Sequence, residues 1–192
     1  MSNSQDQLEK FYAKNRLEWH QWLKEHYNSS LGVWLIYYKK NTGKPRVEYE
    51  EVVEEALKYG WIDSKTKFID EERYMQVFTP RKPGSVWSKS NKGRIKKLIK
   101  NGQMKPAGLE KINTAKKDGS WTILNDIEDL IIPEDLKNTL KQNTVAYKNF
   151  EAFTDSTKKQ VLYWITSAKM KDTRLRRIKK TVELAAKNKK PF

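Results

Sequence analysis

Residues 49–63 read YEEVVEEALKYGWID, and this segment carries the clearest structural signals of the N-terminal half. Its aliphatic residues recur at helical spacing and form one apolar stripe. Glutamates gather towards its start, where the helix dipole favours negative charge, and Gly60 closes it. A short β-prone run, residues 61–63, follows at once, so we predict a helix that leads directly into a strand.

Two more β-prone segments accompany this helix-to-strand unit. Residues 32–38, GVWLIYY, form a β-branched and aromatic run that we expect to be buried on both faces. Residues 67–69 continue the strand that begins at Trp61, and residues 73–78 return after a turn at residues 70–72. The expected assembly is an antiparallel meander of about three strands with helices on one face.

Helices are expected before and after these strands. Residues 5–26 carry apolar side chains at roughly helical spacing and predict one amphipathic helix. Ser88 or Ser90 is a suitable cap for a helix that closes at residues 101–102. A further helix is predicted for residues 106–117.

The fold class that these segments indicate is α+β, a small antiparallel sheet packed with helices and followed by a helical C-terminal part. We expect the α+β part to span residues 1–120 and the helical part residues 121–192. Residues 121–132 are expected to be a connector, and Pro133 suits the first turn of the helix after it.

The charge of the chain is large and unevenly placed. There are 39 Lys and Arg against 24 Asp and Glu, a formal net charge of +15. Residues 81–117 hold 12 basic and 1 acidic side chains, and residues 158–192 hold 12 and 2. Such segregation favours an anionic partner, for which we expect a small molecule, with nucleic acid as the alternative.

Several classes of protein are excluded by what the sequence lacks. Without cysteine there are no disulfides and no thiolate chemistry, and no glycine-rich nucleotide loop or nucleophile elbow is present. His20 and His26 are six residues apart, which places them off a common helical face, so we expect no metal and no cofactor. We found no leader and no membrane anchor, and we expect a cytoplasmic protein.

A candidate binding segment, TPRKPGSVWSKSNKGR, spans residues 79–94. Its prolines lead into serines at a predicted helix N-terminus, where unpaired N–H groups and the positive dipole end attract anions. Basic side chains such as Arg81 add charge, and Trp87 offers a flat surface for stacking. The alternative is a solvated connector in which Trp87 fills the core and a serine only caps the helix.

Two further positions complete the set of candidate residues. Asp63 adjoins the basic segment and could act as a general base, or it could simply bond a backbone amide or pair with Arg81. Thr173 begins the last predicted helix, in which Arg174 and Arg177 share an outer face while Leu175 and Ile178 point inward. An ordinary solvent-exposed basic face is the alternative for this helix.

The residues that carry these candidates also resemble a known family, the YdeI/OmpD-associated proteins of bacteria. The resemblance implies a link to bacteriocin protection, to tolerance of cationic antimicrobial peptides and to porin association, but no reaction and no catalytic residue. Because a chain this basic repels a cationic peptide, direct capture of one is not expected. The motifs are residues 56–63, 78–83, 85–89, 91–92, 102–104 and 106–108, and for the C-terminal OmdA module residues 168–169, 173–174 and 176–178.

From these observations we expect a binding protein rather than an enzyme, with an anionic ligand held in the region from Trp61 to Arg94. Two alternatives stay open, a nucleic-acid-binding module that uses the basic segments 81–117 and 158–190, and an enzyme with Asp63 as general base. The predicted ligand-binding residues are Trp61, Asp63, Arg81, Lys82, Ser85, Trp87, Ser88, Asn91, Arg94, Thr173, Arg174 and Arg177.

Overall fold

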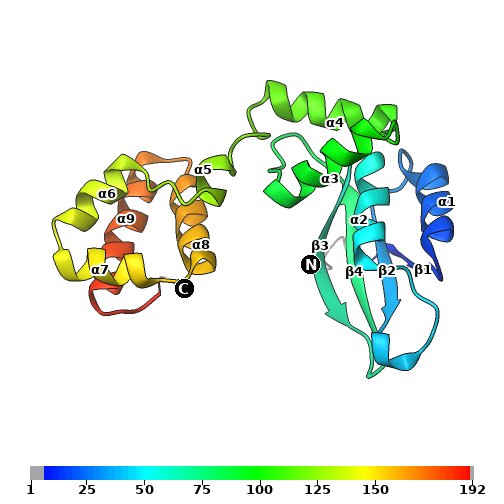
Figure 1. The fold of residues 1–192 in the computed structure, drawn as a ribbon, viewed down its shortest axis with the longest axis horizontal. Coiled ribbons are helices and arrows are strands. Elements are labelled where there is room, and N and C mark those ends of the chain that lie inside the picture. The colour runs from blue at the N-terminus through cyan, green and yellow to red at the C-terminus, as the bar shows by residue number, and fades with distance from the viewer. Residues whose placement is uncertain (1–6, 191–192) are drawn as a thin grey trace. The chain divides into compact units, whose positions relative to one another are not determined.

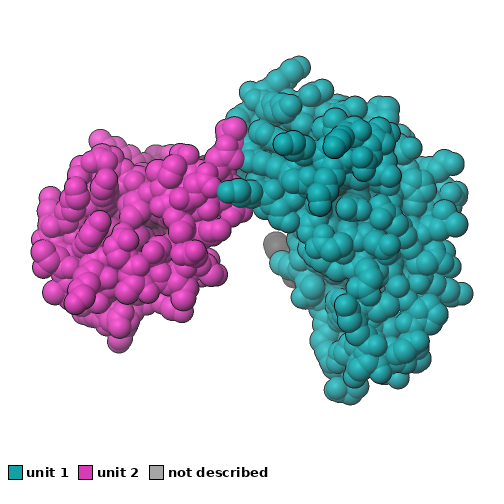
Figure 2. All heavy atoms as spheres, viewed as in Figure 1, with its two compact units in different colours: residues 1–121 teal, residues 122–192 magenta. Residues whose placement is uncertain are grey.

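The computed structural model describes residues 7–190 and divides the chain into two compact units. Unit 1 comprises residues 1–121 and unit 2 residues 122–192 (Figure 2). Unit 1 holds a sheet with helices, and unit 2 is helical (Figure 1). The predicted α+β class with a helical C-terminal part is therefore confirmed.

The sheet of unit 1 differs from the predicted three-stranded antiparallel meander. It has four strands in the order β1 (Glu9–Tyr12), β2 (Val33–Tyr38), β4 (Arg73–Pro80) and β3 (Trp61–Phe68). β1 runs parallel to β2, and the other neighbours are antiparallel. The chain leaves β2 through helix α2 and returns as the β3–β4 hairpin, so β4 rather than β3 pairs with β2.

The predicted helix over residues 5–26 is wrong in its first part. Residues 5–6 lie outside the described part of the chain, and β1 occupies residues 9–12. Helix α1 (Arg16–His26) begins only after Asn15, whose side chain accepts a hydrogen bond from the Glu18 N–H. This N-cap separates β1 from α1. The apolar residues of the two elements taken together fall at roughly helical spacing, which explains the wrong prediction.

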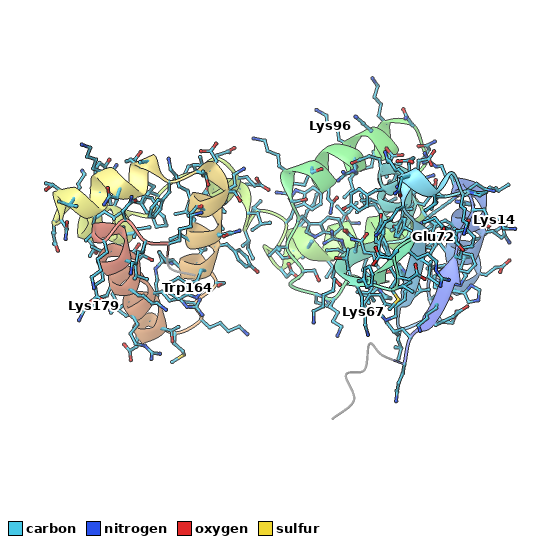
Figure 3. The ribbon with its side chains drawn as sticks, turned by 90° about the horizontal axis from the view of Figure 1, so that it is seen from below. Lys14, Lys67, Glu72, Lys96, Trp164 and Lys179 are labelled. Carbon is cyan, nitrogen blue, oxygen red and sulfur yellow. The ribbon has the colours of Figure 1, made fainter. Side chains whose placement is uncertain are left out.

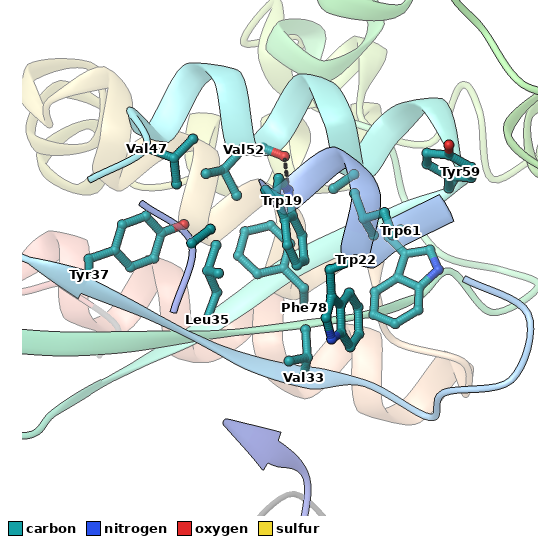
Figure 4. Close-up of a cluster of buried hydrophobic side chains, with 13 residues drawn as sticks. Trp19, Trp22, Val33, Leu35, Tyr37, Val47, Val52, Tyr59, Trp61 and Phe78 are labelled. Atoms are coloured by element: carbon teal, nitrogen blue, oxygen red, sulfur yellow. Dashed lines mark hydrogen bonds between the residues drawn. The ribbon is translucent and has the colours of Figure 1, made fainter. Parts of the chain in front are cut away.

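Helices α1 and α2 (Tyr49–Lys58) lie against the face of the sheet that carries Phe78. The side chains between them form the largest aromatic core of the protein, with Trp19 and Trp22 stacked at a centroid distance of 5.4 Å (Figure 4). Trp19 also donates its indole N–H to the Val52 carbonyl at 3.1 Å, which joins the two helices (Figure 4). The strand at residues 32–38 and the helix at residues 49–59 are thus confirmed within a residue at each end.

Helices α3 (Lys89–Lys100) and α4 (Pro106–Lys117) complete unit 1. Ser88 caps α3 by accepting a hydrogen bond from the Asn91 N–H at 3.2 Å. Helix α4 contacts the end of α2 through Gly108, where a Cβ would lie 2.3 Å from the Lys58 carbonyl oxygen. Only glycine permits this approach, which lets α4 pack closely against the end of α2.

Unit 2 is an all-helical body with a core of its own. Leu136, Leu140 and Phe150 are each fully buried at its centre. The segment 121–132, predicted to be a connector, contains the short helix α5, and Pro133 is the N-cap of α6 rather than a first-turn residue. The helices are α5 (Asn125–Glu128), α6 (Glu134–Lys141), α7 (Thr144–Ala152), α8 (Asp155–Thr166) and α9 (Lys171–Ala186).

A buried ionic cluster links α1 to α2. The carboxylate of Glu55, 2% exposed, lies 2.6 Å from Arg16 Nε, 2.7 Å from Lys58 Nζ and 2.9 Å from His20 Nδ1. Burial alone would raise the pKa of Glu55, but the hydrogen bonds from Lys58, His20 and Arg16 outweigh it and hold the pKa below 4.5. Lys58, 7% exposed, depends on this carboxylate for its compensation.

We expect Glu55→Gln to lower the free energy of unfolding of unit 1 by about 3–5 kcal/mol, because it leaves the Lys58 charge buried without an anionic partner. The matched control is Glu54→Gln, which removes only the half-exposed pair with Arg16 and should cost less than about 1 kcal/mol. Urea unfolding followed by tryptophan fluorescence measures both, since six of the seven tryptophans belong to unit 1.

The difference in stability between wild type and Glu55→Gln should depend on pH. Because the folded pKa of Glu55 is lowered, its stabilising contribution is present above the unfolded pKa and is lost as the pH falls through the folded value. The difference in urea midpoint between wild type and Glu55→Gln should therefore shrink below about pH 4. A constant difference down to pH 3 would contradict this assignment.

Candidate functional site

A cavity of about 150 Å³ lies between the loop that follows β4 and the C-terminal half of α4. Four of the predicted ligand-binding residues line it, Arg81, Lys82, Ser85 and Trp87. The opposite wall comes from α4 and from the turn at Asp118 that ends it. The structure thus brings together the central part of the predicted site.

The loop is held by hydrogen bonds at both ends. The Arg81 N–H donates to the Gly60 carbonyl at 2.9 Å, which continues the pairing of β3 with β4 by one residue. Gly84, with φ of 76°, turns the chain, and its N–H donates to the Asp118 carboxylate at 2.9 Å. The chain therefore enters the loop from the sheet and is fastened across the cavity to the end of α4.

Arg81 is the unusual residue of this cavity, because its cationic side chain is only 3% exposed. The guanidinium carbon lies 3.5 Å from the centre of the Trp87 ring, and Nη1 donates to the Val86 carbonyl at 3.0 Å. Nε and Nη2 are buried and have no hydrogen-bond partner among residues 7–190. In the same part of the chain no carboxylate lies within 4.0 Å of the guanidinium.

The electrostatics of the cavity follow from this arrangement. Burial lowers the pKa of Arg81 to about 10, and the field of Asp63 only partly opposes it. Hydrogen bonds from Ser120 and from the Gly84 N–H hold the pKa of Asp118 below its usual value, so this acid is already engaged. Counting all side chains, three cations and two acids line the cavity, which leaves it cationic.

Trp61 and Asp63, the predicted β3 members of the site, do not line the cavity. Trp61 is 1% exposed, belongs to the aromatic core and donates its indole N–H to the Tyr27 carbonyl.

Asp63 accepts hydrogen bonds from the Tyr49 hydroxyl and from Gln76 Nε2, each at 2.9 Å. Burial and the neighbouring Asp63 raise the pKa of Tyr49 to about 12. Among residues 7–190, Asp63 shows neither of the two simple roles considered for it, a hydrogen bond from a backbone amide or an ion pair with Arg81.

The predicted members on α3 serve the helix itself. The Ser88 hydroxyl is used as the N-cap, and the Asn91 N–H is its donor. Arg94 forms a two-fold contact with the Glu50 carboxylate, at 2.9 and 2.8 Å, which ties α3 to the start of α2. The Arg94 charge is therefore compensated within the protein.

Thr173, Arg174 and Arg177 belong to unit 2. Arg174 pairs with Asp135 at 2.6 Å, whereas Thr173 and Arg177 line a hollow beside Trp164. Leu175 was expected to point inward but is 51% exposed, because the residues that α9 buries are Ile178, Thr181 and Ala185.

Sequence reasoning missed a second pocket in unit 1. It has a volume of about 330 Å³ and is lined by His20, Tyr27, Tyr59, Lys24 and Lys105, among others. His20 faces it while Nδ1 contacts the buried Glu55 carboxylate. No local pattern could have revealed this pairing, because the two residues are 35 positions apart.

Two family models match the chain. Residues 129–188 match the model described as "Bacteriocin-protection, YdeI or OmpD-Associated" (OmdA). Residues 11–111 match a model described as a domain of unknown function (DUF8412). The class defined by fold and comparison is thus a two-unit protein with an α+β domain of unknown function and a helical OmdA unit.

Because the second match spans more than half of the chain, the chain belongs to the family of that domain of unknown function. Unit 2 is similar to the YdeI/OmpD-associated (OmdA) family, as the C-terminal motifs predicted. The OmdA model covers unit 2, and the motifs between residues 56 and 108 fall within the domain of unknown function. No curated protein and no solved structure matches the chain. In the part of the chain that the structure describes, no helix is long and apolar enough to cross a membrane, and no group of three or more metal-ligating side chains occurs.

Arg81→Met should leave the free energy of unfolding of unit 1 unchanged within about 1 kcal/mol, or raise it. Methionine has a similar length and no charge, so the variant loses one hydrogen bond and one cation–π contact but removes an uncompensated buried cation. Urea unfolding measures the difference. A loss of more than about 2 kcal/mol would mean that Arg81 stabilises the fold, and the case for a ligand at this residue would then fail.

Proposed function

We propose that unit 1 binds a small anion in the cavity lined by Arg81. The observation that carries this proposal is a buried guanidinium, that of Arg81, with no carboxylate partner among residues 7–190. Buried charges in proteins are normally paired, because an uncompensated charge in the interior costs several kcal/mol, roughly 3–5 when one partner of a pair is removed. An anionic ligand would compensate the Arg81 charge. Part of the free energy that the buried charge costs the unbound protein would then be recovered when the ligand binds.

The geometry of the guanidinium supports an oxyanion as the ligand. Nη1 is occupied by the Val86 carbonyl, whereas Nε and Nη2, which form one edge of the planar group, have no partner among the described residues. This edge is the fork that arginine uses for two parallel hydrogen bonds to a carboxylate or a phosphate. The stacking on Trp87 fixes the plane of the fork before any ligand arrives.

The size of the cavity limits the ligand. A cavity of about 150 Å³ is smaller than the usual site for a drug-sized ligand and suits inorganic phosphate, sulfate or a short carboxylic acid. Lys82 and Lys111 would add long-range attraction, while Glu110 and Asp118 would disfavour a ligand of high negative charge.

This proposal also bears on bacteriocin protection, which the family description names. A formal net charge of +15 repels cationic peptides, so we propose that protection does not run through direct capture of the peptide. Binding of a small anion would make the protein a sensor or carrier of that anion instead. In the basic segments 81–117 and 158–190, which the nucleic-acid alternative would use, Arg94 and Arg174 are already paired with carboxylates.

Isothermal titration calorimetry with phosphate, sulfate and malonate tests this function. We expect one of these anions to bind with a stoichiometry of one, and Arg81→Met to weaken it by about tenfold to a hundredfold, the worth of a charged hydrogen-bond pair. The control is Lys96→Met, which removes a cation that points away from the body of unit 1 (Figure 3) and should change little. Equal weakening by both substitutions would identify diffuse attraction rather than a site.

A further inference from the structure

Unit 2 carries a hollow of about 300 Å³ between α8 and α9. Its lining consists of one tryptophan from α8 and four residues at helical spacing on one face of α9. Three of these four are cations, and none of the described residues that line the hollow is acidic. The lining residues are Trp164, Thr173, Arg176, Arg177 and Lys180.

The aromatic and cationic groups of the hollow are held against each other. The guanidinium of Arg177 lies 5.2 Å from the centre of the Trp164 ring, and Lys180 Nζ lies 5.8 Å from it. Arg177 Nη1 donates to the Trp164 carbonyl and to Ser167 Oγ, which fixes the plane of the guanidinium. The hollow therefore presents a flat, preorganised surface with positive charge beside it.

Two cations of this hollow differ from neighbouring cations on α9, which have carboxylate partners. Arg174 pairs with Asp135 at 2.6 Å, and Lys179 lies 4.0 Å from Glu183. Among the described residues, neither Arg176 nor Lys180 has a carboxylate within 4.0 Å, although like charges at positions i and i+4 repel by about 0.2–0.5 kcal/mol. The charges of Arg176 and Lys180 are therefore not compensated by an ion pair among the described residues.

We propose that this hollow binds a nucleotide unit, with its base against the Arg177–Trp164 surface and its phosphate between Arg176 and Lys180. Stacking on an aromatic or guanidinium plane accepts any base, and Arg and Lys together suit a phosphate. The volume lies at the lower limit of small-molecule sites, which fits one nucleotide. The unit comes either from a free nucleotide or from an unpaired strand, since the chemistry recognised is the same.

This site is independent of the Arg81 cavity, because it shares no residue with it and belongs to the other unit. Titrations are therefore done in full-length Arg81→Met protein, in which only the hollow of unit 2 remains as a proposed anion site. Failure of one proposal then leaves the other untouched.

The probes are adenosine, inorganic phosphate, adenosine monophosphate and an oligothymidylate of about eight nucleotides, a length within the range of single-strand sites. Binding is followed by the NMR signal of the Trp164 indole N–H, which Trp164→Phe assigns. We expect adenosine monophosphate to shift this signal at lower concentration than adenosine or phosphate does. The oligothymidylate arm shows whether an unpaired strand is preferred to the free nucleotide.

The decisive variants compare cations on the same helix. Lys180→Ala and Arg176→Ala should each weaken nucleotide binding by about tenfold, the worth of one charged contact. Lys179→Ala removes a cation that lies on the side of α9 away from Trp164 (Figure 3) and should change binding by less than about twofold. Equal losses in all three variants, or a Trp164 signal that responds to no probe, would overturn the proposal.

Discussion

One hydrogen bond, from the Arg81 N–H to the Gly60 carbonyl at 2.9 Å, joins the elements on which unit 1 depends. It extends the β3–β4 pairing past the end of the sheet, at the point where α2 has just ended. Because the backbone is held there, the Arg81 side chain is carried into the interior and onto Trp87. Ser88 then starts α3 directly after this contact. The end of α2, the start of α3 and the candidate cavity thus all adjoin this one hydrogen bond.

Unit 1 buries two cationic side chains and compensates them in different ways. Lys58 contacts the Glu55 carboxylate, which Arg16 and His20 also hold, so its charge is neutralised inside the protein. Arg81 has an aromatic ring and one carbonyl, which orient it but do not neutralise it. The first arrangement is typical of a structural cluster. In the second, the buried positive charge stays uncompensated, and an anionic ligand can compensate it. This difference is the physical basis of the proposed function.

The sequence predicted those features that depend on neighbouring residues. The stripe of α2, the β-prone run of β2 and the Ser88 cap are local patterns, and the structure has all three. Strand order is not local, so the parallel pairing of β1 and the central place of β4 could not be read from periodicity. Part of the candidate site was predictable because Arg81 and Trp87 lie close in sequence. The compensation of Arg94 was not, because Glu50 is 44 residues away.

Anion binding at Arg81 is best tested by the NMR signal of the Arg81 Nε–H group in arginine-labelled protein, which Arg81→Lys assigns. Upon titration with phosphate, sulfate or malonate, we expect this signal to shift progressively and to saturate, because an oxyanion would accept hydrogen bonds from the unpartnered edge. A signal that stays in place throughout the titration of all three anions would show that the buried guanidinium does not meet them, and the central claim would be wrong.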